Sequence, residues 1–88
     1  GPLAPARELL GEMLLESGNP AEALKAFEAT MAKEPNRFRG AYGAARAAEA
    51  LGDHPTARRH YGALLEIARG GDANRSSIEH ARAYLAKR

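Results

Sequence analysis

The chain has 88 residues, no cysteine, and 13 basic against 11 acidic side chains, a formal net charge of +2. A chain of this length forms one small domain, and without cysteine it can have neither disulfides nor thiolate metal sites. Charges of both signs are interleaved, which argues against nucleic-acid binding through a clustered basic face. No apolar run reaches the roughly 20 residues that span a bilayer. Residues 1–3 are a lead-in, because Gly1-Pro2 resembles the remnant of a cleaved purification tag.

A helical hairpin is predicted over residues 4–35. Gly18 can take the left-handed conformation that closes the first helix. Asn19 can then cap the second helix, with Pro20 in its first turn. Pro35 disfavours helix at the preceding residue and separates this hairpin from the next.

A second hairpin is predicted over residues 36–70, followed by a shorter helix over about 75–87. The residues that delimit the second hairpin are Asn36 as a cap, Asp53 or His54 before Pro55 at the turn, and Gly70-Gly71 at the end. Ser76 and Glu79 have the spacing of a capping box, which marks the start of the last helix.

The two hairpins repeat one another at a period of 34 residues. The matched pairs are Gly18 with Gly52, Ala23 with Ala57, and Phe27 with Tyr61. Small residues are expected where the two helices of a hairpin cross, at Gly11, Ala23, Ala45 and Ala57. The two aromatic residues are expected to fill the spaces between neighbouring helices.

These residues resemble the tetratricopeptide repeat, whose pattern is a large residue, Leu-Gly, an aromatic or leucine, then Ala-x-x-x-Phe and Pro. The first unit reads Leu10-Gly11-x-x-Leu14, Ala23-x-x-x-Phe27 and Pro35, and the second reads Ala44-Ala45-x-x-Ala48 and Ala57-x-x-x-Tyr61. The departures are Arg7, Ala41 and Arg69. The resemblance covers about residues 4–69 and implies an all-α solenoid of two antiparallel hairpins plus a capping helix. It also implies a protein-interaction module rather than an enzyme. The alanine- and arginine-rich composition is typical of a bacterial source with a GC-rich genome.

Helical geometry, at 100° per residue, separates an inner from an outer face on the first helix of each hairpin. The expected core residues are Ala6, Leu10, Met13 and Leu14 on the first helix, and Gly40, Ala44, Ala47, Ala48 and Leu51 on the third. The resemblance implies that the opposite faces line a concave groove for a peptide or helix of a partner protein. The candidate groove residues are Glu8, Glu12, Leu15, Arg39, Tyr42, Arg46 and Glu49.

Two interpretations of the groove remain open. Glu12 and Arg46 can pair with each other across it, or Tyr42 and the arginines can form a recognition patch, because tyrosine and arginine are favoured at interface hot spots. Glu8 and Glu12 would repel a carboxylate, so binding of a chaperone's C-terminal tail is not expected. Gly43 indicates either tight helix packing or the close approach of a partner backbone.

Leu9 and Leu15, with Leu3, exceed what one hairpin can bury. They can pack against an upstream hairpin, against a second copy of the chain as a homo-oligomer joined through end faces, or against a partner. For the chain as a whole, a third interpretation besides peptide binding and self-association is that it is an accessory helical domain of a larger enzyme or regulator.

No pattern for catalysis, a cofactor or a metal is found. His54, His60 and His80 lack a second ligand at metal-type spacing on the same helix, and they are interpreted as solvated or hydrogen-bonded surface residues. Gly70-Gly71 lacks the lysine of a phosphate loop. Basic residues of the second half, from Arg58 onward, are interpreted as solvated helix charges or as contacts for an acidic partner. The absence of cysteine fits a cytoplasmic location and excludes no other.

Overall fold

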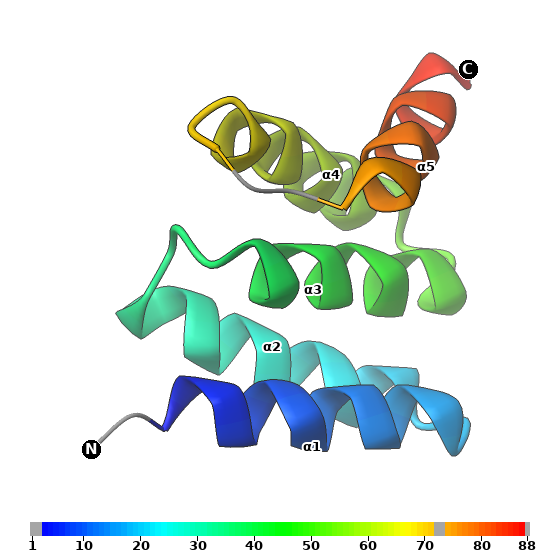
Figure 1. Cartoon of the computed structure of the whole chain (residues 1–88). Coiled ribbons are helices and arrows are strands. Elements are labelled where there is room, and N and C mark those ends of the chain that lie inside the picture. Colours follow the sequence, from blue (N-terminus) through cyan, green and yellow to red (C-terminus); the bar gives the residue numbers. More distant parts are fainter. Residues whose placement is uncertain (1–2, 72–73, 88) are drawn as a thin grey trace.

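The computed structural model describes residues 3–71 and 74–87, so Gly1-Pro2, the expected tag remnant, lies outside the described residues. Within these ranges the chain forms five helices and no strand, arranged as stacked antiparallel hairpins (Figure 1). They are α1 (Ala4–Glu16), α2 (Pro20–Lys33), α3 (Phe38–Leu51), α4 (His54–Ala68) and α5 (Arg75–Ala86). The predicted all-helical fold is confirmed. None of the described helices has the length and apolar character needed to cross a membrane.

The first helix of each hairpin ends in the same backbone motif. Gly18 and Gly52 both have positive φ, at 84° and 77°. The amide that follows each glycine donates to a carbonyl at the end of the helix, that of Leu14 at 2.8 Å and that of Ala48 at 3.0 Å. This is the 6→1 bond of a Schellman motif, which glycine favours because it has no Cβ. The predicted left-handed stop at Gly18 is therefore confirmed, and its equivalent recurs 34 residues later.

The starts of the helices agree only partly with the predicted caps. Asp53 caps α4 as expected, accepting a hydrogen bond from the amide of Thr56 at 3.3 Å. Hydrogen bonds from Thr56 lower the pKa of the Asp53 carboxyl below its ordinary value. Asn74, and not Ser76, caps α5, because its Oδ1 accepts from the amide of Ser77 at 3.1 Å.

Two other predicted caps are wrong because their side chains are not used by the helix. Asn19 lies at the N-cap of α2 but makes no capping bond. Its amide instead donates to Ser17 Oγ at 3.1 Å. The N-cap of α3 is Arg37 rather than Asn36, and the Arg37 side chain is engaged by Glu8 of α1.

The predicted helix crossings and aromatic positions are buried. The small residues at the crossings are Gly11, Ala23, Ala45 and Ala57, and the aromatic ones are Phe27 and Tyr61. The Phe27 ring lies between α1 and α3 so closely that a Cβ at Gly11 or Gly43 would lie 2.7 Å or 2.2 Å from it. Gly43 therefore serves tight packing, and its interpretation as a contact for a partner backbone is wrong, because Phe27 occupies that space.

Helix α3 is the centre of the stack because it is apolar on two sides. Ala44 and Ala47 pack in one cluster with Phe27, and Ala41 and Ala45 pack in another with Tyr61. The predicted core stripe of α3 is thus confirmed except at its last residue. Leu51 is 44% exposed, because α3 ends there and the chain turns away at the following glycine.

Helix α1 is rotated relative to the prediction. Its buried residues are Ala4, Glu8 and Gly11, whereas the expected core residues Ala6, Leu10 and Met13 are exposed. Leu14 and Leu15 are half-buried and pack beside the Phe27 cluster. The Phe27 ring explains the rotation, since it requires a residue without a side chain on the facing side of α1. The most hydrophobic face of the helix consequently points outward.

Candidate functional site

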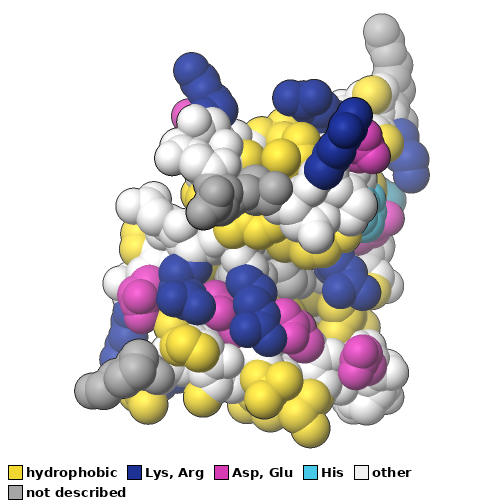
Figure 2. Space-filling view, in the orientation of Figure 1, with side chains coloured by type: hydrophobic (Ala, Val, Ile, Leu, Met, Phe, Trp, Pro, Cys, Tyr) yellow, Lys and Arg dark blue, Asp and Glu magenta, His cyan; other side chains and the backbone are white. Residues whose placement is uncertain are grey.

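One face of the stack is formed by α1, α3 and α5, and here called the α1–α3–α5 face. Figure 2 shows acidic and basic side chains alternating in a row across the middle of the molecule, above the position of α1 in Figure 1. The residues that link the three helices on this face are Glu12, Arg39, Tyr42, Glu49 and His80. Arg46 of α3 lies among them over the Tyr42 ring. Five of the seven predicted groove residues therefore lie together on this face. Of the other two, Leu15 packs beside the Phe27 cluster and Glu8 is buried.

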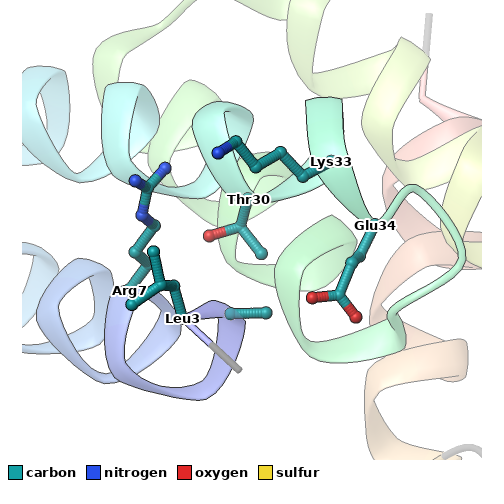
Figure 3. Close-up of a pocket in the computed structure, with 6 residues that line it drawn as sticks. Leu3, Arg7, Thr30, Lys33 and Glu34 are labelled. Atoms are coloured by element: carbon teal, nitrogen blue, oxygen red, sulfur yellow. The ribbon is translucent and has the colours of Figure 1, made fainter. Parts of the chain in front are cut away.

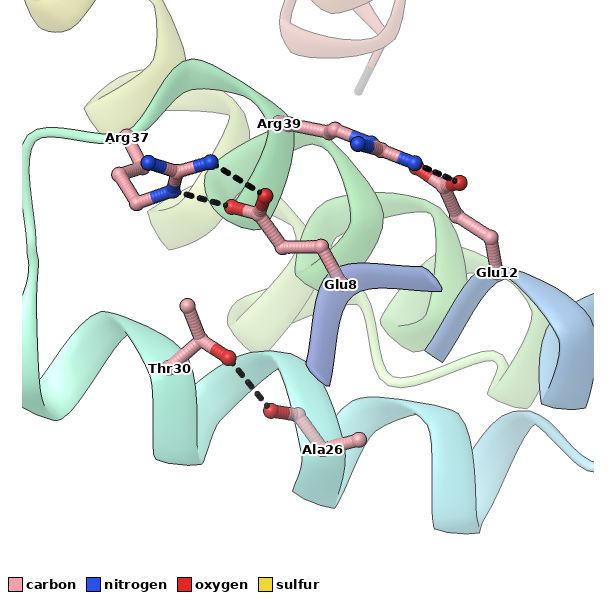
Figure 4. Close-up of polar contacts among 6 residues, drawn as sticks. All are labelled: Glu8, Glu12, Ala26, Thr30, Arg37 and Arg39. Atoms are coloured by element: carbon pink, nitrogen blue, oxygen red, sulfur yellow. Dashed lines mark hydrogen bonds and ion pairs between the residues drawn. The ribbon is translucent and has the colours of Figure 1, made fainter. Parts of the chain in front are cut away.

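Two bidentate ion pairs join α1 to the start of α3 (Figure 4). Nε and Nη2 of Arg37 each donate to a carboxylate oxygen of Glu8 at 2.8 Å. Arg39 binds Glu12 in the same way at 2.7 Å. The hydrogen bonds from Arg39 lower the pKa of the Glu12 carboxyl below its ordinary value, although partial burial opposes this shift. The carboxylates of Glu8 and Glu12 are thus both neutralised within the chain.

Two predictions about these glutamates are wrong. Glu8 is fully buried and does not reach the groove, because α1 turns it toward Arg37 and the backbone at Gly40. Glu12 pairs with Arg39 and not with Arg46, because Arg39 lies on the first turn of α3 beside it. The repulsion expected between these glutamates and a ligand carboxylate is accordingly weakened.

The junction of α3 and α5 is held by a network around His80. His80 Nε2 lies 3.0 Å from Glu49 Oε1, and the Tyr61 hydroxyl donates to that same oxygen at 2.6 Å. A carboxylate only accepts hydrogen bonds, so Nε2 carries the proton shared with Glu49. His80 Nδ1, at 2.9 Å from the Tyr42 hydroxyl, then accepts from that hydroxyl while the imidazole is neutral.

The network shifts the pKa values of its two acidic groups in opposite directions. Partial burial acts to raise the pKa of Glu49, but the hydrogen bonds from Tyr61 and His80 outweigh it and lower that pKa below its ordinary value. Burial and the nearby Glu49 carboxylate raise the pKa of the Tyr61 phenol well above its ordinary value. Glu49 is therefore ionised and Tyr61 protonated at neutral pH.

The rings of this network continue into an aromatic cluster that consists of Tyr42, Tyr61, Tyr84 and His80. Ring centroids lie 5.0 Å apart for Tyr61 and Tyr84, 5.1 Å for Tyr61 and His80, and 5.7 Å for Tyr42 and His80. His54 adds a hydrogen bond to the Tyr84 hydroxyl from the start of α4. The cluster therefore fixes α5 against both α3 and α4.

The predicted character of the histidines is correct for His54 and wrong for His60. His54 is exposed and hydrogen-bonded, as expected. His60 is 6% exposed, because it lies between α4 and α2 with its Nε2 at 2.8 Å from Glu28 Oε2. Among the residues that the structure describes, no three His, Asp or Glu side chains are grouped as metal ligands.

A hollow of about 230 Å³ opens on the α1–α3–α5 face beside this network. Its lining residues are Arg46, Glu49, Ala50 and His80. The Arg46 guanidinium lies 5.7 Å from the centroid of the Tyr42 ring, a cation–π distance. Arg46 is exposed and, within residues 3–71 and 74–87, has no carboxylate within 4.0 Å. It is therefore the cation of this face that is free to meet a ligand.

A smaller cavity of about 110 Å³ lies away from this face, between the start of α1 and the end of α2. Figure 3 shows Arg7 of α1 and Lys33 of α2 on either side of Thr30. Arg7 is half-buried and lines the cavity, and the aliphatic stem of an arginine can cover apolar surface. This geometry accounts for an arginine where the repeat pattern has a large apolar residue.

Comparison with protein families identifies the fold. A family model described as tetratricopeptide repeat matches residues 14–76, which is more than half of the chain. The chain belongs to the tetratricopeptide repeat family. Tetratricopeptide repeats generally mediate protein–protein interactions and are typically non-catalytic. Neither the curated proteins nor the solved structures compared with the chain include a match.

Two contributions to this part of the tetratricopeptide repeat domain were not predicted from the sequence: His80, which belongs to the α1–α3–α5 face, and Arg37, which binds the buried Glu8. The position of His80 matches a position of the preceding repeat unit, but only at an offset that differs from the 34-residue period. Helix α3 begins 34 residues after α1, and α4 begins 34 after α2, whereas α5 begins 37 after α3. With the longer offset, His80 takes the place of Gly43, and it touches the Tyr61 ring as Gly43 touches that of Phe27.

Proposed function

We propose that this tetratricopeptide repeat domain binds a peptide or helical segment of a partner protein on the α1–α3–α5 face, and that Arg46 pairs with an acidic side chain of that segment. The observation that carries the proposal is the exposed and unpaired position of the Arg46 side chain within the described residues. It is exposed, lies over the Tyr42 ring and borders an open hollow, while the neighbouring arginines are held by glutamates. Tyrosine and arginine together are typical of interface hot spots.

The polar groups that surround Arg46 support an acidic ligand. Glu49 is occupied by Tyr61 and His80, and Glu12 by Arg39. A carboxylate that approaches Arg46 would form a charge-assisted hydrogen bond without breaking any of these contacts. Ala50 leaves the adjacent wall of the hollow free of a large side chain.

Selection from a library of displayed random peptides tests this proposal. We expect the enriched peptides to contain Asp or Glu, and their affinity to fall about tenfold or more in the Arg46→Ala variant, the loss of one charge-assisted hydrogen bond. Tyr42→Phe is preferable to Tyr42→Ala as a second variant, because Tyr42 also packs in the aromatic cluster.

The matched control is Arg59→Ala, which removes an exposed arginine that contacts Glu28 of α2. It should leave peptide affinity unchanged. Peptides without acidic residues, or equal binding by Arg46→Ala and the parent chain, would place the binding surface elsewhere.

A further inference from the structure

The outer side of α1 is the largest exposed apolar feature of the described chain. Four of its five exposed large hydrophobic residues lie at or beside this helix: Leu3, Leu9, Leu10 and Met13, each between 50% and 57% exposed. At 100° per residue, Leu3, Leu10 and Met13 share one side of the helix, and Leu9 lies next to them. Figure 2 shows hydrophobic side chains along the lower edge of the molecule, where Figure 1 places α1. A contiguous exposed patch of large apolar side chains is normally covered by a partner.

This outer side of α1 carries a negative charge at one end. Glu16 is the exposed charged residue of α1, and it lies two turns after Leu9 on nearly the same side. Glu16 lies at the C-terminal end of α1, where the helix dipole disfavours an acid. The exposed apolar residues Leu3, Leu9, Leu10 and Met13 are here called the apolar ridge. The ridge thus ends in a carboxylate that has no cationic partner within residues 3–71 and 74–87.

A hollow at the other end of the stack has the complementary character. It measures about 250 Å³, lies between α4 and α5, and is lined by Leu65, Ala68, Ile78, Arg69 and Arg82. Its floor is apolar and its two charged residues are basic. Arg69 is paired with Glu66, whereas Arg82 is exposed and has no carboxylate within 4.0 Å in the described part of the chain.

We propose that a second copy of this chain docks head-to-tail, with the outer side of its α1 in the hollow between α4 and α5. Leu10 and Met13 enter the apolar hollow, and Glu16 pairs with Arg82. The apolar contacts supply affinity, and the ion pair sets the orientation. This surface is separate from the α1–α3–α5 face, so the inference does not rest on the proposed peptide binding.

Charge complementarity favours this arrangement over a symmetric pairing of two α1 helices. A symmetric pair would cover the apolar ridge but would leave Arg82 and the hollow unmatched. In the head-to-tail arrangement every copy uses both surfaces, because the ridge and the hollow lie on different helices. Such a heterologous contact continues from copy to copy into a ring or a filament.

Light scattering coupled to size-exclusion chromatography, over a wide range of concentrations, tests whether the chain associates. We expect the mass of the parent chain to rise with concentration. Met13→Glu, which removes the ridge, and Arg82→Glu, which removes the charge of the hollow, should each remain monomeric. Both side chains are exposed, so circular dichroism should show unchanged helicity, and Leu10→Gln is a second ridge variant should Met13→Glu lose helicity.

Mixing the two monomeric variants separates head-to-tail docking from symmetric pairing. Met13→Glu retains the hollow and Arg82→Glu retains the ridge, so an equal mixture should give a heterodimer of defined mass. Glu16→Arg combined with Arg82→Glu in one chain should restore association by exchanging the charges.

Leu51→Glu is the matched control, because Leu51 is an exposed leucine outside both surfaces, and it should associate like the parent chain. A parent chain that stays monomeric at millimolar concentration would overturn the proposal. So would Arg82→Glu that associates as well as the parent chain, since that result indicates symmetric α1 pairing.

Discussion

The most constrained side chain of the domain is Phe27, whose ring lies between two glycines on different helices. A Cβ on Gly43 would lie 2.2 Å from the ring, far inside van der Waals contact. We expect Gly43→Ala to lower the free energy of unfolding by about 1–3 kcal/mol, because overpacking outweighs the better helix propensity of alanine. Urea denaturation followed by circular dichroism measures this change.

Gly62, in the middle of α4, is the matched control for Gly43. A Cβ at Gly62 would meet nothing within 4 Å. Gly62→Ala should therefore raise the free energy of unfolding by about 1 kcal/mol, the helix-propensity difference alone. If both substitutions stabilise the domain, the close contact between Gly43 and Phe27 is not a constraint on the fold.

Two of the three glutamates of α1 allow the effect of burial to be compared for one kind of contact. Glu8 and Glu12 each make two hydrogen bonds to an arginine, but the Glu8 side chain is 0% exposed and that of Glu12 is 33% exposed. Glu8→Gln should lower the free energy of unfolding by about 1.5–3 kcal/mol, the range for hydrogen bonds to charged groups. Glu12→Gln should lower it by about 0–1 kcal/mol, because water screens the pair. Equal losses in thermal melts would contradict the role of burial.

At the scale of the helices, the buried face of α3 could be predicted from the sequence better than that of α1, because the prediction relied on hydrophobicity. On α3 the small residues form both buried faces, so small size and burial coincide. On α1 the largest apolar residues point outward and the buried side carries Ala4, Glu8 and Gly11. A prediction from helix periodicity places the most hydrophobic side chains in the core, and it takes no account of the space that the Phe27 ring requires.

Glu49 of α3 binds His80 of α5, which makes the docking of α5 sensitive to acid. The pKa of Glu49 in the folded chain is below its ordinary value of 4.5, so the unfolded chain binds this proton first. The stabilisation by Glu49 is present above about pH 4.5 and is lost as the pH falls through the lowered pKa of the folded chain. We expect the melting temperature of Glu49→Gln to fall less than that of the parent chain between about pH 5 and about pH 3.

Glu34→Gln is the control for this pH dependence, because Glu34 is exposed and its side chain makes no hydrogen bond or ion pair in the described part of the chain. Its melting temperature should follow that of the parent chain. Parallel curves for Glu49→Gln and the parent chain would show that the Glu49 carboxylate does not hold α5.

At the scale of the whole molecule, the architecture could be predicted from the sequence because the residues that repeat every 34 positions each have a single structural role. Gly18, Gly52, Phe27 and Tyr61 each occupy a position that few other residues can fill. The site could be predicted less completely. Ion pairs such as Arg37 with Glu8 join residues 29 apart, and no local pattern specifies them. The longer connection before α5 also displaces His80 from the 34-residue register.

The aromatic cluster divides the molecule into two optically distinct halves. The chain has three tyrosines and no tryptophan. All three, Tyr42, Tyr61 and Tyr84, lie on α3, α4 and α5 and come together around His80, while the α1–α2 hairpin has none. Tyrosine fluorescence therefore reports on the second half alone, whereas circular dichroism reports on every helix. Because repeat proteins can unfold one unit at a time, a difference between the two signals reveals whether the first hairpin melts separately from the rest.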